Sequence, residues 1–87
     1  MFDEPVVTLL IYIYRNGGTI ENFRATMTKL DYSSSKLDRA RRVLKQYGLI
    51  REEIVKGAPV VLKITLTDKG KEAARKIIDL KKFLEEA

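Results

Sequence analysis

The apolar positions in the first third of the chain predict two helices joined by a short strand. Residues 5–15 form the first helix, because Pro5 suits a first helical turn and an Asn-Gly-Gly triplet follows its end. Residues 19–20 form the strand, and in residues 21–30 apolar side chains recur at the spacing of one helix face. We expect the next residue, Asp31, in the left-handed backbone conformation, which aspartate tolerates better than most residues.

The rest of the chain predicts a third helix, a β-hairpin and a long final helix. Residues 34–47 are helical, with a buried arc made of Leu37, Ala40, Val43, Leu44 and Tyr47. Residues 51–66 form the hairpin, in which two β-branched runs flank a three-residue tip and alternate residues from Val60 to Leu66 form a buried face. Thr67 caps the last helix, residues 67–86. Together these elements predict one α+β, mainly helical domain over residues 1–87.

The first and last helices carry more apolar surface than one small domain needs. Between residues 6 and 15 only Thr8 and Arg15 are polar, so the first helix needs two surfaces to bury it. The stripe on the last helix is similarly wide. We therefore predict a symmetric homodimer. Its predicted interface consists of Val6, Leu10, Ile13, Ile77, Leu80, Phe83 and Leu84. The alternative is that all these side chains fill the core of a monomer.

Positive charge is concentrated in the third predicted helix. The chain has 17 Lys and Arg against 12 Asp and Glu, a net charge of +5, and five of those cations lie within residues 31–48 beside two acids. A protruding basic helix attracts polyanions, and the planar Arg fork pairs with guanine or phosphate. The alternative is a solvated basic face that serves only solubility.

The composition argues against an enzyme, a metal site and a membrane protein. With no His and no Cys, the chain lacks the commonest general base and metal ligands, and it has no Gly-rich phosphate loop. We expect no cofactor and no metal, and no small-molecule effector is evident from the sequence. The apolar run at residues 6–14 is far shorter than the about 20 residues that cross a bilayer. Acids precede that run, so we expect a cytoplasmic protein, and the Lys, Arg and Glu content is typical of thermophiles.

Three short motifs carry a resemblance to a known family. They are Leu30-Asp31-Tyr32-Ser33, Tyr47-Gly48-Leu49-Ile50 and Leu66-Thr67-Asp68-Lys69-Gly70. In this order of elements the chain resembles small prokaryotic and archaeal winged helix-turn-helix transcriptional regulators related to the MarR, PadR and ArsR groups. The resemblance implies a recognition helix at residues 34–47 in the major groove, a wing at residues 51–66, and a dimer formed by the terminal helices. This chain departs from the family in its very short wing, with Glu52 and Glu53 near the base.

On this hypothesis the polar residues of the third helix and the wing tip contact DNA. The predicted DNA contacts are Ser34, Ser35, Lys36, Arg39, Arg41, Arg42, Lys45 and Lys56. Phosphates are assigned to Lys36, Arg41, Lys45 and Lys56, and base edges to Ser35, Arg39 and Arg42. Ser33, Ser34 and Ser35 either cap the helix or bind phosphate. Asp38 would repel phosphate, so its predicted role is to orient Arg42 through an i,i+4 ion pair.

The sequence therefore predicts a dimeric regulator of transcription, acting as a repressor, that binds double-stranded DNA sequence-specifically. Two copies of the recognition helix would enter successive major grooves about 34 Å apart. Two alternatives remain open. One is an architectural protein that coats DNA with little sequence preference. The other is a winged-helix module that binds another protein through the same face.

Overall fold

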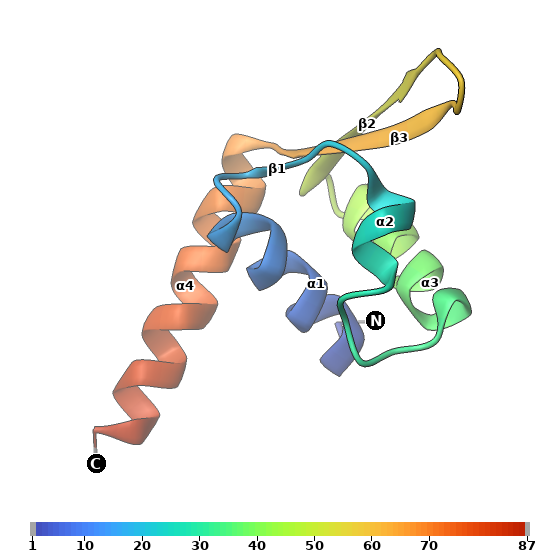
Figure 1. Cartoon of the computed structure of the whole chain (residues 1–87). Helices are drawn as coiled ribbons and strands as arrows, with labels where there is room; N and C mark the ends of the chain where they lie inside the picture. The colour runs from blue at the N-terminus through green and yellow to red at the C-terminus, as the bar shows by residue number, and fades with distance from the viewer. Residues whose placement is uncertain (1, 87) are drawn as a thin grey trace.

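The computed structural model describes residues 2–86, which form four helices and three strands (Figure 1). In chain order they are α1 (Glu4–Arg15), β1 (Thr19–Ile20), α2 (Phe23–Met27), α3 (Ser34–Gln46), β2 (Ile50–Val55), β3 (Val61–Leu66) and α4 (Asp68–Glu85). This is the predicted α+β, mainly helical order of a winged helix-turn-helix. The two end positions of the predicted domain, 1 and 87, lie outside the described residues.

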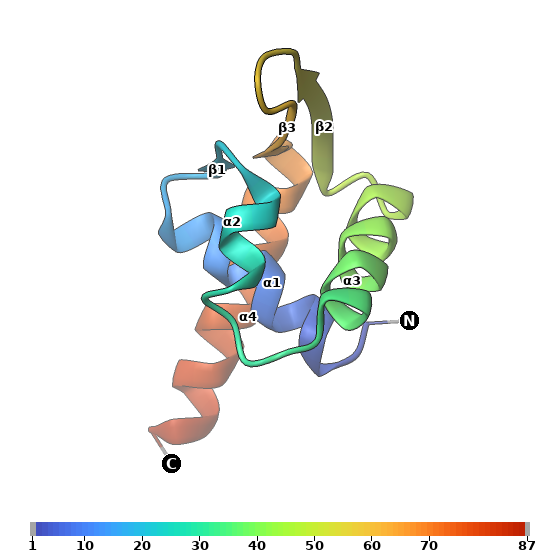
Figure 2. The same cartoon turned by 45° about the vertical axis from the view of Figure 1, so that its right-hand side comes forward.

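The three strands form one antiparallel sheet in the order β1-β3-β2. β2 pairs with β3 from Ile50↔Leu66 to Val55↔Val61, so the connecting loop is residues 56–60 and not the predicted three-residue tip. The predicted buried face of the second strand holds for Ile64 and Leu66. It does not hold for Val60, which is 60% exposed. The difference arises because the hairpin extends past the core, as Figure 2 shows.

The core lies between α1, α3 and the inner face of the sheet. Its largest fully buried side chains are Val6, Leu9, Leu10, Ile13, Leu37, Leu44, Ile64 and Leu66. Every one of these comes from α1, α3 or β3, so three segments far apart in the sequence share one cluster. Each such side chain contributes about 1.5–3 kcal/mol by leaving water.

α3 begins and ends as its sequence predicts, apart from its last residue. Ser33 is the N-cap, and its hydroxyl accepts a hydrogen bond from the Lys36 N–H at 3.3 Å. Gly48, with φ +74°, follows the helix. Tyr47 was predicted to lie on the buried arc, but it is exposed, because it follows the last helical residue and packs edge-on against Phe2 instead.

α2 is shorter than the predicted residues 21–30. Asn22 is its N-cap and accepts from the Ala25 N–H, and Thr28 is its C-cap, whose hydroxyl donates to the Ala25 carbonyl at 2.8 Å. The expectation of a left-handed Asp31 is wrong, since within residues 2–86 only glycines have positive φ. Tyr32 is half-buried, and its hydroxyl donates to Glu4.

The start of α4 is bonded to the exit of α3. Thr67 is the N-cap, as predicted, and accepts from the Gly70 N–H at 3.0 Å. The Thr67 N–H donates to the Leu49 carbonyl at 3.0 Å, and its hydroxyl donates to the Gly48 carbonyl at 2.7 Å. From this junction α4 extends away from the rest of the molecule, so that its C-terminal end and the wing lie at opposite ends in Figure 1.

Candidate nucleic-acid interface

One face of α3 is open to solvent and carries most of the predicted contacts; we call it the recognition face. Its exposed members are Ser34, Ser35, Arg39, Arg42 and Lys45. Lys36 is also exposed, but at 100° per residue it lies about 120° from Arg42, on the flank of the helix. The opposite face packs into the core through Leu37, Ala40 and Leu44. In Figure 2 the helix runs along one side of the molecule, with the wing projecting beyond it. Lys56 is also exposed, but it lies in the wing loop.

Arg39 points toward the start of α1. Its Nη2 lies 2.8 Å from the Asp3 Oδ2, and Asp3 also caps α1 by accepting from the Val6 N–H. The hydrogen bond from Arg39 holds the pKa of Asp3 below its ordinary value. A base or a phosphate would therefore compete with Asp3 for this guanidinium.

Asp38 pairs with Arg42, which confirms the predicted i,i+4 interaction. It also accepts hydrogen bonds from Arg41, at 3.2 Å to Nε and 2.7 Å to Nη2. The hydrogen bond from Arg41, with smaller contributions from Arg42, keeps the pKa of Asp38 low. The carboxylate is thus ionised and shared, and Arg42 stays 68% exposed at the surface.

Arg41 points inward, unlike the other cations of the helix. Its side chain is 16% exposed, and its Nη1 donates to Glu52 of β2. The guanidinium carbon also lies 5.7 Å from the centre of the Phe23 ring of α2. Glu52 also forms an ion pair with Lys45, whose Nζ lies 3.2 Å from the Glu52 Oε1. The sequence pattern assigned Arg41 to phosphate, whereas its partners here are within the protein.

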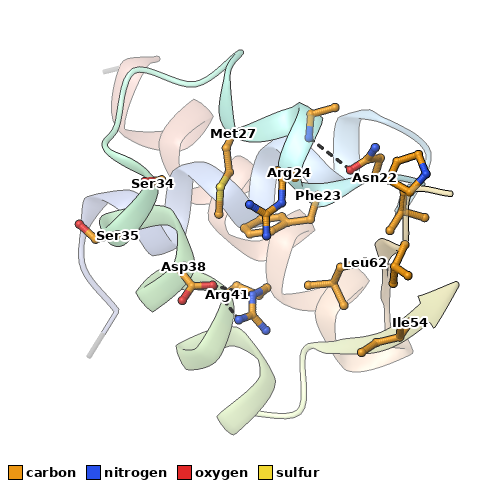
Figure 3. Close-up of a pocket in the computed structure, with 14 residues that line it drawn as sticks. Asn22, Phe23, Arg24, Met27, Ser34, Ser35, Asp38, Arg41, Ile54 and Leu62 are labelled. Atoms are coloured by element: carbon orange, nitrogen blue, oxygen red, sulfur yellow. Dashed lines mark hydrogen bonds and ion pairs between the residues drawn. The ribbon is translucent and has the colours of Figure 1, made fainter. Parts of the chain in front are cut away.

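A groove of about 860 Å³ lies between α2, the start of α3 and the wing (Figure 3). Apolar side chains of α2 and the wing, Phe23, Met27, Ile54 and Leu62, line it beside the pair Asp38 and Arg41. Ser34 and Ser35 line it from α3. The groove joins the recognition face to the wing, so a ligand on one can reach the other.

The wing is more apolar than its predicted role suggests. Ile54 and Val60 are exposed on it, with Val55 partly so, while Lys56 is the cation of its loop. In a monomer, water covers 67% of Ile54, 60% of Val60 and 38% of Val55. The wing surface therefore favours close, dry contact with a partner over long-range attraction.

Two polar residues of this surface were not predicted. Arg24 of α2 is exposed and lines the groove, although the apolar spacing of this helix marked it as a support. Gln46, the last residue of α3, is exposed as well. At 100° per residue it lies about 40° from Arg42, so helix geometry alone could have found it.

The helix-turn-helix of α2 and α3 with the β2–β3 hairpin defines a winged helix-turn-helix domain, and solved structures share it. A transcriptional regulator homologue from Pyrococcus horikoshii OT3 matches with a TM-score of 0.79 and 23% identity, over 93% of this chain and 80% of that one. F-93 of SSV1 matches at 0.69 and 23%, over 98% and 93%. The reduced transcriptional regulator YodB from B. subtilis matches at 0.70 and 20%, over 92% and 78%. At these identities the likeness establishes the fold.

No protein-family model and no curated protein matches the chain. Across residues 2–86, none of the helices combines the length and apolar character needed to cross a membrane. The same residues contain no group of three or more acidic side chains arranged to hold a metal ion.

Proposed function

We propose that this protein is a sequence-specific double-stranded DNA-binding regulator of transcription, acting as a repressor. The observation that carries the proposal is the recognition face, a row of exposed hydroxyl and basic side chains on the second helix of a helix-turn-helix. In such a helix these side chains can enter a major groove. The similar structures named as transcriptional regulators support the same function.

Within this face, Arg42 is the strongest candidate for a base contact. It is exposed, and Asp38 holds its guanidinium by one nitrogen, which limits its rotamers before DNA arrives. A bidentate Arg–guanine pair contributes about 1–3 kcal/mol of discrimination. Ser35 and Arg39 are the further base candidates, and Lys36, Lys45 and Lys56 the phosphate candidates.

We propose in addition that two copies associate through the C-terminal half of α4. Leu80, Phe83 and Leu84 are exposed there, Phe83 by 72%, and half-buried Ile77 continues the stripe toward the core. Their spacing places them on one side of the helix, which suits a symmetric helix pair. The predicted interface residues Val6, Leu10 and Ile13 are 0% exposed within a single chain, so the proposed interface is confined to α4.

The dimer is tested by the mass of the protein in solution. Phe83→Lys should give a folded monomer by sedimentation equilibrium at micromolar concentration, because one lysine would face an apolar stripe in each copy. Lys81→Ala, an exposed neighbour outside the stripe, should leave the mass unchanged. A wild-type protein that is monomeric at every concentration would contradict this part of the proposal.

DNA binding is tested by fluorescence anisotropy with a labelled random duplex at about 50 and 200 mM salt, followed by selection of sites from a random library. We expect affinity to fall steeply with salt and selection to return a pseudo-palindrome. Arg42→Ala should relax the preference at one base position, whereas Lys76→Ala on α4, which is exposed far from the recognition face, should not.

Other outcomes would point to the alternatives. Protection of all sequences alike would favour an architectural role. No binding at either salt would favour a protein-binding module, a function consistent with the exposed apolar side chains Ile54 and Val60 of the wing.

A further inference from the structure

The guanidinium of Arg41 contacts three elements of the DNA-binding unit, and Figure 3 shows two of the partners, Asp38 of α3 and Phe23 of α2. Its Nε and Nη2 donate to Asp38 on its own helix, and its Nη1 donates to Glu52 on the wing. Its plane lies over Phe23, which begins α2. A guanidinium offers two edges for bidentate pairing, Nε with one Nη, and the two Nη together. Asp38 occupies one edge of this group and Glu52 a nitrogen of the other, so neither is left whole for a phosphate.

Burial separates Arg41 from the cations that can reach DNA. Arg41 is 16% exposed and Glu52 only 11%, whereas Lys45 is 62% exposed. Burial on its own would lower the pKa of Arg41, but the hydrogen bonds that it donates to Asp38 and Glu52 outweigh it and raise the pKa, so the group stays charged. Drawing Arg41 out to a phosphate would leave Glu52 shielded from water with Lys45 as its remaining cation. That exchange is unfavourable.

Glu52 is where the wing is tied to the recognition helix. Over the part of the chain that the structure describes, both ion pairs that join α3 to the hairpin end on this carboxylate. Beyond it the hairpin extends to the largely exposed side chains of Ile54 and Val60. The Arg41–Glu52 contact therefore adds a side-chain link between α3 and the wing to the packing of Ile50, Ile64 and Leu66 at the base of the hairpin.

We propose that Arg41 is a positioning residue that fixes the angle between the recognition helix and the wing, and thereby sets which DNA segment the wing contacts once the helix occupies its groove. The proposal rests on the DNA-binding function proposed above. Arg41 itself does not contact DNA. Glu52 is its partner in this role. This role explains why an acid, which would repel phosphate, lies at the base of the wing.

The test compares footprints on the selected DNA site. Methylation of guanine N7 reports occupation of the major groove by α3, and hydroxyl-radical cleavage reports the backbone beside the wing. Glu52→Gln keeps the side chain's shape and loses its charge. We expect this variant to retain the major-groove protection, lose the wing protection, and bind about fivefold more weakly, the contribution of about one phosphate contact near 0.15 M salt.

A double substitution that leaves the net charge unchanged tests whether Arg41 positions the wing or contacts DNA directly. Arg41→Met with Glu52→Met replaces the ion pair by two apolar side chains of similar length, which can hold the wing in place without it. If Arg41 positions the wing, the double variant should recover the wing protection and keep the wild-type dependence of log K on log salt. If Arg41 contacts a phosphate, the magnitude of that slope should fall by about 0.9. Lys36→Gln, at an exposed phosphate candidate, is the matched control. It should lower the magnitude of the slope of log K against log salt by about 0.9.

The outcomes distinguish this proposal from the function on which it rests. Absence of any footprint with the wild-type protein overturns both. A wild-type footprint that Glu52→Gln leaves unchanged, or a double variant that does not recover the wing protection while its thermal unfolding matches wild type, overturns the role of Arg41 alone.

Discussion

Replacing Gly70 by alanine should destabilise the fold, although a Gly→Ala change inside a helix ordinarily stabilises it. Gly70 lies in the first turn of α4 and is buried against the backbone at the exit of α3. A Cβ at this position would lie 2.0 Å from the carbonyl oxygen of Leu49 and 3.2 Å from the Leu66 Cδ2. The oxygen cannot move freely, since it accepts the Thr67 N–H that begins α4. The substitution therefore forces apart two backbone segments that hydrogen bonds hold together.

The expected size follows from three contributions. Exchange of glycine for alanine in an open helix gains about 1 kcal/mol. Forcing a methyl group into a packed site costs about 1–3 kcal/mol, and weakening the Thr67–Leu49 hydrogen bond costs about 1 kcal/mol more. Gly70→Ala should then lower the free energy of unfolding by about 1–3 kcal/mol.

Urea unfolding followed by circular dichroism, at one fixed protein concentration, measures this change. Gly57→Ala in the wing loop is the control, because its added Cβ would meet only the Pro59 carbonyl oxygen at 3.5 Å, an ordinary contact. It should stay within about 0.5 kcal/mol of wild type. A Gly70→Ala protein as stable as wild type, or more so, would refute the packing argument.

Substitutions at three further positions test other parts of the fold in the same unfolding assay. Gly48→Ala should cost about 1 kcal/mol through its φ of +74° alone, since nothing lies within 4 Å of the added methyl group, and Gly48→Asn should cost less. Leu44→Ala, at a fully buried core position, should cost about 2–5 kcal/mol. Asp38 has a pKa below its ordinary 3.8 because Arg41 donates to it, so its ionised form stabilises the fold above that pH and the contribution disappears as pH falls through the lowered pKa. The stability of wild type should therefore decline more steeply below pH 3.8 than that of Asp38→Asn; equal slopes would contradict it.

Local patterns in the sequence predicted the elements whose ends are determined by their own residues. α3 begins after the N-cap Ser33 and ends before Gly48, and α4 begins after the N-cap Thr67. The residues that determine each of these ends lie within one helical turn of it. The sequence predicts too long an α2 because the apolar stripe continues through Leu30, whereas the helix ends at Met27 with Thr28 as its C-cap. Periodicity reports which residues are buried, and Leu30 packs against the core from outside the helix.

The candidate site was predicted in its location and not in its pairing. A helical wheel places Arg42 outward with Asp38 as its neighbour. Both results depend only on residues within one turn of the same helix. The partner of Arg41 is Glu52, 11 positions away on a different element, and the partner of Arg39 is Asp3, 36 positions away. No periodic pattern encodes such pairs, because they depend on how the hairpin and α1 dock against α3. For the same reason the apolar girth of α1 was assigned in part to a second subunit, when one chain suffices to cover it.

Hydrogen bonds between Thr67 and the exit of α3 couple a tilt of α4 to the position of the recognition helix. An 18-residue helix is about 27 Å long, and in the proposed dimer the two copies would meet at its far end. A tilt of about 7° at that end displaces the near end by about 3.4 Å, the rise of one base pair of B-DNA. The spacing between half-sites that the dimer accepts would thus depend on how rigidly Leu80, Phe83 and Leu84 pack across it. A rigid interface would distinguish operators whose half-site spacing differs by one base pair, and a soft interface would bind both alike.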